Sequence, residues 1–84
     1  MINISYTNYR YDELYDAGPD SCGELIVKLF LRMRKMDQGQ VIKVISYDLG
    51  AVADVPAWCR MQGHELLTMN EEGLLITNFY IKKC

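Results

Sequence analysis

The residue of this sequence best suited to chemistry is Cys22, within the stretch Asp20-Ser21-Cys22-Gly23-Glu24. Ser21 and Glu24 have the S-x-x-E spacing of a capping box, in which each side chain bonds a backbone N–H at the start of a helix. The spacing therefore predicts Ser21 as the N-cap residue and Cys22 as the first helical residue. Unpaired N–H groups and the positive end of the helix dipole would then favour the nucleophilic thiolate of Cys22.

Two other features of this stretch bear on the reactivity of the thiol. A small cysteine can simply pack where a loop meets a helix, since reactivity requires both exposure and a lowered pKa. The carboxylate of Asp20 also lies close in sequence, and its negative charge would oppose formation of the thiolate. The local sequence therefore leaves open whether Cys22 is a reactive thiol or a packed one.

The remaining cysteines and the single histidine do not indicate a second reactive centre. Cys59 lies on the apolar stripe of a predicted helix, where a free cysteine is usually a small buried hydrophobe. Together with Cys22 and Cys84 it makes three widely spaced cysteines, which predict neither a disulfide scaffold nor a zinc site. His64 is distant from Cys22 in sequence, and no third residue indicates a cysteine–histidine hydrolase. We therefore expect no metal and no cofactor, and we expect Cys22 to act alone through sulfur exchange.

Length and composition indicate one small folded domain over residues 1–84. Half of the residues are hydrophobic and only two are proline, which argues against disorder. The net charge of −2 provides no global basic field, so direct binding of nucleic acid is not expected. Residues 1–6 do not resemble a secretory signal, and no stretch approaches the length of a membrane span. We expect a cytoplasmic protein with reduced thiols, present as a monomer or a weak dimer.

Periodicity and turn residues predict the elements that must position Cys22. Alternation around Tyr11, Glu13 and Tyr15 predicts a first strand, followed by a turn over residues 17–20. A helix is expected over residues 22–36, closed by a turn in which Gly39 takes a left-handed conformation. The apolar face of this helix is predicted to comprise Leu25, Ile26, Leu29, Phe30, Met33 and Met36.

The same helix carries two further groups of residues outside its apolar face. Val27 and Leu31 lie beside that face, and we expect them to be ordinary scattered surface hydrophobes; the alternative is a small exposed apolar spot. Lys28, Arg32 and Lys35 form a basic stripe, which is either a solvated face or a surface for an acidic partner.

The second half of the chain predicts one more helix and three strands. Residues 40–47 are β-branched and apolar on both faces, which is typical of a central strand. Residues 51–61 predict a helix with Cys59 on its buried stripe and Trp58 at the edge of the core. Its start is expected to be irregular, because Pro56 lies too deep for the first turn if the helix begins at Leu49. Strands over residues 64–70 and 74–81 would form a hairpin through a turn at residues 71–73. This order predicts an α/β two-layer sandwich, with two helices packed on one face of a four-stranded mixed sheet.

A set of positions spread over residues 15–82 is typical of one protein family. These positions are Asp16-Ala17, Cys22 with Glu24, Gly39, Asp48, Asp54-Val55-Pro56-Ala57-Trp58-Cys59 and Gly63-His64-Glu65-Leu66. In these positions the sequence resembles the TusA/SirA-like sulfur carrier proteins. The resemblance implies a βαβαββ fold whose cysteine at the start of the first helix carries sulfur as a persulfide, and it maps that cysteine onto Cys22.

The sequence departs from the family pattern directly after this cysteine. The usual C-P-x-P motif reads Cys22-Gly23-Glu24-Leu25, so both prolines are missing. Proline fixes the backbone at the start of a helix. Its replacement by Gly23 makes the start of the helix less stable by on the order of 1 kcal/mol. The departure puts recognition by the family's usual partners in doubt.

The resemblance and the local sequence together favour a sulfur carrier without turnover of its own. In this hypothesis Cys22 accepts sulfane sulfur from a cysteine desulfurase or a rhodanese-like donor and relays it to an acceptor sulfurtransferase. Asp20, Ser21, Gly23 and Glu24 are its expected supporting residues. The alternative is a protein-interaction or regulatory module on the same fold that has lost carrier chemistry. An RNA-binding module would need a basic aromatic patch, which the sequence does not have.

Overall fold

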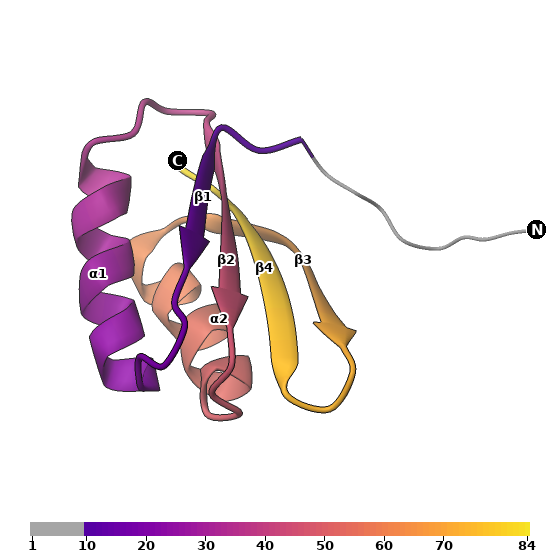
Figure 1. Ribbon diagram of the computed structural model, residues 1–84. Coiled ribbons are helices and arrows are strands. Elements are labelled where there is room, and N and C mark those ends of the chain that lie inside the picture. Colours follow the sequence, from indigo (N-terminus) through magenta and orange to yellow (C-terminus); the bar gives the residue numbers. More distant parts are fainter. Residues whose placement is uncertain (1–9) are drawn as a thin grey trace, which may run out of the picture.

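Two central strands, β2 (Val41–Ser46) and β4 (Ile76–Lys82), organise the computed structural model, which describes residues 10–84 (Figure 1). The strand order is β1-β2-β4-β3, with β1 (Glu13–Asp16) and β3 (Glu65–Glu72) at the edges. β1 is parallel to β2, and the other neighbouring pairs are antiparallel. The predicted four-stranded mixed sheet and its central strand are therefore confirmed. Residues 1–6, which we expect not to be a secretory signal, lie outside the described residues.

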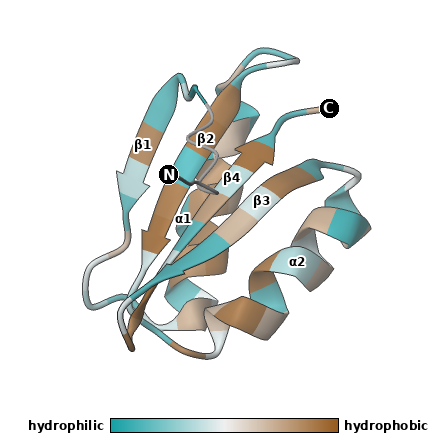
Figure 2. Ribbon diagram, turned by 90° about the vertical axis from the view of Figure 1, so that its right-hand side faces the viewer, coloured by the Kyte–Doolittle hydropathy of each residue, from teal (hydrophilic) through white to brown (hydrophobic). Residues whose placement is uncertain are grey.

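Helices α1 (Cys22–Arg34) and α2 (Ala51–Gln62) cover the same face of this sheet (Figures 1 and 2). Ile42 pairs with Ile81 and Val44 with Phe79, so these four side chains share the face toward the helices. Paired residues on neighbouring strands point to the same side of a sheet. All four side chains are buried, because the helices cover this side. The predicted two-layer βαβαββ sandwich is confirmed. Neither helix within residues 10–84 has the length and apolar character needed to cross a membrane.

The capping box predicted at the start of α1 is present. The Glu24 backbone N–H donates to Ser21 Oγ at 3.4 Å, and the Ser21 backbone N–H donates to Glu24 Oε1 at 3.2 Å. The helix ends at Arg34, two residues earlier than predicted, because the N–H groups of Lys35 and Met36 bond carbonyls three residues back. This tighter turn still keeps Met36 buried in the core.

The predicted apolar face of α1 is wrong at Phe30. Its ring is 39% exposed, whereas Leu25, Leu29 and Met33 are fully buried. Phe30 lies at the rim of a surface hollow of about 260 Å³, and Trp58 of α2 lines the same hollow. The Arg34 guanidinium lies 5.6 Å from the centre of the Phe30 ring, so solvent and a cation replace core contacts there. Val27 and Leu31, outside that face, are exposed at 59% and 49%.

The irregular start predicted for the second helix is confirmed. The N–H groups of Ala51 and Val52 bond carbonyls three residues back, at 3.1 and 3.3 Å, as in a 3₁₀ turn. Pro56 lies inside the helix and has no N–H to continue the usual pattern. The helix ends at Gly63 with a left-handed φ of +79°, which glycine adopts without a steric penalty.

The hairpin between β3 and β4 differs from the prediction by two residues. β3 continues to Glu72, which pairs with Ile76, so residues 73–75 form the loop instead of residues 71–73. Gly73 has a φ of +68°, which suits a three-residue hairpin loop. This register places Leu74 and Leu75 at the tip of the hairpin. β1 likewise begins at Glu13, leaving Tyr11 before the strand.

Candidate functional site

The starts of both helices lie at one end of the sheet, where β1 and β2 finish (Figure 1). Because these strands are parallel, their carboxyl ends meet at the same edge. Cys22 at the start of α1 is therefore close to the loop of residues 47–50 that precedes α2. This closeness brings together residues that are 26 or more positions apart in sequence.

The carboxylate of Asp48 joins the two helix starts. Its Oδ2 accepts a hydrogen bond of 2.9 Å from the Cys22 backbone N–H, and its Oδ1 accepts one of 2.8 Å from the Gly50 backbone N–H. The Asp48 N–H in turn donates to the buried Ser46 Oγ at 3.1 Å. The N-cap residue of α2 is Gly50, which has no side-chain capping bond, so Asp48 binds the turn before α2 and does not cap that helix. The bond from the Cys22 N–H shows that Asp48 holds the first helix in place.

Gly50 lies directly against the sulfur of Cys22, and the sequence analysis did not identify it. A Cβ atom added at Gly50 would lie 3.3 Å from Cys22 Sγ and 3.2 Å from Asp48 Oδ1. Both distances are shorter than ordinary van der Waals contact, so a larger side chain would displace the thiol or the carboxylate. A glycine between a strand and a helix was the available signal, and it does not by itself reveal which atom the glycine faces.

The electrostatic surroundings of Cys22 favour the thiol over the thiolate. The pKa of Cys22 is raised, first by a hydrogen bond to the carboxylate of Asp54, then by partial burial and by the negative charges of Asp54 and Asp48. A bond at the Cys22 backbone lowers the pKa, but by less. The expectation that the helix start favours the thiolate is therefore wrong for the net effect, because two carboxylates from α2 and its loop oppose it. The side chain itself is half-buried beside the core.

Asp20 does not have the role that its sequence position suggested. Its Oδ2 lies 3.0 Å from Lys28 Nζ and accepts a hydrogen bond of 3.0 Å from the Tyr15 hydroxyl. The bond with Lys28 lowers the pKa of Asp20, while burial and Asp20 together raise the pKa of Tyr15 to about 12. Asp20 therefore stabilises the loop before α1, and the charges that act on the Cys22 thiol are those of Asp54 and Asp48.

The other predicted supporting residues act on Cys22 through the backbone. Ser21 and Glu24 close the capping box on either side of it. Gly23 has open space around it, since an added Cβ would meet only Ser21 Oγ at 4.0 Å. These residues fix where the helix begins and leave the sulfur environment to Asp48, Gly50 and Asp54.

The remaining candidate residues lie away from this site. Cys59 is buried at 1% exposure within α2, and burial raises its pKa to about 11. His64 Nδ1 accepts a hydrogen bond of 3.3 Å from the Cys84 N–H, at the end of the sheet where Glu65 pairs with Lys82. This is the end opposite Cys22. Within residues 10–84 no three His, Cys, Asp or Glu side chains are grouped as a metal site.

A first prediction concerns the order in which the cysteines react. With iodoacetamide at pH 8 we expect Cys22 to be alkylated about tenfold faster than Cys59, because the buried Cys59 requires local opening and has a raised pKa. Peptide mapping by mass spectrometry measures both rates. In denaturant all three cysteines should react alike. Faster labelling of Cys59 than of Cys22 in the folded protein would contradict the assignment.

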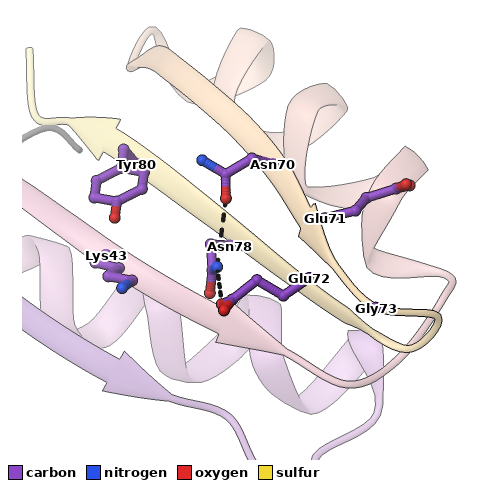
Figure 3. Close-up of a pocket in the computed structure, with 7 residues that line it drawn as sticks. All are labelled: Lys43, Asn70, Glu71, Glu72, Gly73, Asn78 and Tyr80. Carbon is purple, nitrogen blue, oxygen red and sulfur yellow. Dashed lines mark hydrogen bonds between the residues drawn. The ribbon is translucent and has the colours of Figure 1, made fainter. Parts of the chain in front are cut away.

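A separate polar hollow of about 590 Å³ lies on the sheet face away from the helices (Figure 3). Asn78 Nδ2 donates to Asn70 Oδ1 at 3.4 Å and to Glu72 Oε1 at 2.5 Å across this face. Lys43 Nζ lies 5.6 Å from the ring centre of Tyr80. The hollow contains no thiol or imidazole, so we do not assign it to the chemistry of Cys22.

Comparison with known proteins relates this chain to sulfur carrier proteins. The family model described as sulfurtransferase TusA matches residues 13–83. The chain is 35% identical over 74 residues to the putative sulfur carrier protein YrkI of Bacillus subtilis (strain 168), covering 88% of this chain and 97% of that protein. It is 35% identical over 67 residues to the sulfur carrier protein TusA of Pseudomonas putida (strain W619), covering 80% and 84%.

A third relative is longer than this chain. The putative sulfur carrier protein of Aquifex aeolicus (strain VF5) is 40% identical over 77 residues, which cover 90% of this chain and 38% of that protein. The similarity there concerns one part of a larger polypeptide.

Proposed function

The chain belongs to the sulfurtransferase TusA family, and from that membership and the geometry around Cys22 we propose a sulfur carrier that holds sulfane sulfur as a persulfide on Cys22. The observation that carries the proposal is the position of this thiol. It stands at the first residue of α1, between a capping box and the carboxylate of Asp48, and at the molecular surface. The buried Cys59 offers no comparable access for a second protein.

The transfer step needs no oxidant and no reductant. The sulfur of Cys22 attacks the outer sulfur of a donor persulfide, a new S–S bond forms at Cys22, and the S–S bond of the donor breaks. The donor cysteine leaves as a thiolate and takes up the proton that Cys22 gives up. The carboxylate of Asp54, on α2, favours the protonated form of the resting thiol, so this proton must be lost before the attack. Passing the sulfur to an acceptor repeats the exchange in the opposite direction.

The donors that fit this step are proteins that themselves form a persulfide. A cysteine desulfurase and a rhodanese-like protein both present an outer sulfur that a thiol can attack, and an acceptor sulfurtransferase would then remove it from Cys22. The three free cysteines suit a reducing compartment, which is the reason we place this relay in the cytoplasm.

One observation favours the alternative, an interaction module without carrier chemistry. The raised pKa of Cys22 leaves less thiolate near neutral pH than an unperturbed cysteine would have. In that alternative the same surface binds a partner and no sulfur is transferred. The two functions differ in whether Cys22 ever gains sulfur, which can be measured directly.

Intact-protein mass spectrometry tests the proposal. The protein is incubated with sodium polysulfide, or with a cysteine desulfurase and L-cysteine, and the sample is divided before and after treatment with dithiothreitol. A carrier gains one sulfur atom that the reductant removes. A folded protein that gains no sulfur from any of these sources would favour the interaction module.

A second prediction concerns the pH dependence of the thiol. Asp54→Asn removes the negative charge beside Cys22, so it should lower the pKa of Cys22 and move the pH midpoint of alkylation downward. At pH 7 the variant should therefore be alkylated faster than the parent. Iodoacetamide kinetics from pH 6 to pH 10 measure the midpoint. Asp37→Asn, an exposed carboxylate just beyond the far end of α1, is the matched control and should leave it unchanged. A midpoint that does not move in Asp54→Asn would refute this account of the thiol.

A further inference from the structure

The end of the molecule that holds Cys22 is strongly acidic. Three segments meet there, namely residues 16–24, residues 46–54 and the hairpin residues 71–75 (Figure 1). They contain seven acidic residues and no lysine or arginine, although the whole chain has nine basic and eleven acidic residues. The rest of the chain is therefore net basic. We call this surface the acidic end, and its charged residues are Asp16, Asp20, Glu24, Asp48, Asp54, Glu71 and Glu72.

Large apolar side chains are exposed among these carboxylates. Their exposed fractions are 42% for Tyr47, 62% for Leu49, 93% for Leu74 and 58% for Leu75. Tyr47, Leu49 and Leu75 line one groove of about 510 Å³, together with the loop of residues 18–21. Exposed apolar groups gathered in this way, with a polar rim, are typical of an interaction surface.

This groove reaches the residues that directly precede Cys22 and Gly50. Ser21 and Leu49 both line it, and they directly precede Cys22 and Gly50, the residue that packs against Sγ. A protein that fills the groove therefore lies beside the residues that flank Cys22. The groove is lined by residues of all three segments of the acidic end.

We propose that the acidic end is the docking surface for the protein that donates sulfur to Cys22, and that this donor inserts an apolar side chain flanked by arginine or lysine. The proposal rests on the function proposed for Cys22 and adds the chemistry of its partner. Opposite charges accelerate encounter and select the partner, whereas an acidic protein or a nucleic acid would be repelled. An acidic partner, which was considered for the basic stripe of α1, does not suit the acidic end. Two residues of that basic stripe already interact within the protein: Lys28 pairs with Asp20, and Arg32 lies 4.6 Å from the Tyr15 ring centre.

The same charges give docking a chemical consequence. In the free protein the carboxylates of Asp54 and Asp48 raise the pKa of the Cys22 thiol and so favour its protonated form. A cation of the donor placed beside Asp54 compensates part of that negative charge and so favours the thiolate. Transfer is then fastest in the docked complex, which limits reaction of the free thiol with other electrophiles.

The apolar part of the proposal is tested with the double variant Leu49→Asp/Leu75→Asp. Both side chains are exposed, so the fold should survive. We expect the rate of sulfur transfer from a cysteine desulfurase supplied with L-cysteine, and from a persulfide-loaded rhodanese, to fall about tenfold or more. Loading by sodium polysulfide should change less than about twofold, because that small molecule needs no docking surface. Met61→Asp, at an exposed apolar residue near the other end of α2, is the control and should behave like the parent.

The charged part is tested with Glu71→Lys against Glu65→Lys. Both glutamates are exposed on β3, but Glu71 lies at the acidic end and Glu65 at the opposite end of the strand. Figure 3 shows the Glu71 side chain directed away from Asn78 and Glu72, so its replacement leaves their hydrogen bond intact. Transfer from the protein donors should slow several-fold in Glu71→Lys only, and 0.5 M salt should reduce this difference, since the Debye length is then about 4 Å.

The outcomes separate this inference from the proposed function. If neither polysulfide nor a protein donor loads Cys22 in the folded parent, the carrier function itself is refuted. If polysulfide loads Cys22, and both protein donors transfer sulfur to the Leu49→Asp/Leu75→Asp variant at the parental rate, the carrier function is retained and the proposed docking surface is wrong. The docking proposal is also wrong if polysulfide loads the parent protein with sulfur and neither protein donor does.

Discussion

Cys22→Ser should abolish the gain of one sulfur atom in mass after incubation with a persulfide donor. Serine is close in size to cysteine and can remain at the first position of α1, so the capping box and the bond to Asp48 should persist. The hydroxyl cannot form a persulfide, and the loss of loading should be complete. Intact-protein mass spectrometry before and after reduction gives the result in one experiment.

Two variants of the other cysteines serve as controls for this result. Cys59→Ser and Cys84→Ser should each retain full loading, because Cys59 is buried and Cys84 lies at the end of the sheet opposite Cys22. Cys59→Ser places a hydroxyl in the core and should lower the free energy of unfolding by about 1–3 kcal/mol, so circular dichroism must show that it is folded. Loading that persists in Cys22→Ser, or that disappears in Cys84→Ser, would assign the sulfur to another thiol.

Asp48→Ala should lower the free energy of unfolding by about 2–3 kcal/mol, since it removes the acceptor of two charge-assisted hydrogen bonds. These bonds join the start of α1 to the turn before α2, and no other side chain among the described residues accepts from the Cys22 N–H. For a domain of this size the loss is a large fraction of the total stability. Urea unfolding followed by circular dichroism measures the change.

Asp37→Ala is the matched control for this loss of stability. Asp37 is an exposed carboxylate after α1, and the structure gives its side chain no hydrogen bond. Its replacement should change the free energy of unfolding by less than about 0.5 kcal/mol. If Asp48→Ala and Asp37→Ala unfold at the same urea concentration, the bridge between the helix starts does not stabilise the fold as described.

What the sequence determined by itself was local. The capping box closes within four residues, so Ser21 and Glu24 could be identified from their spacing, and with them the position of Cys22 at the start of α1. The βαβαββ order and the central position of β2 were likewise predicted, because periodicity records which faces of an element are buried. The burial of Cys59 followed from the same pattern.

The tertiary structure alone decided the environment of the sulfur. Asp48, Gly50 and Asp54 lie 26 to 32 positions after Cys22, and they reach it because parallel pairing of β1 with β2 brings two helix starts to one edge. Electrostatic energy depends on distance in space and on burial, so Asp20, the nearest carboxylate in sequence, pairs with Lys28 while Asp54 acts on the thiol. For the same reason the acidic end could be recognised only after the fold had joined its three segments.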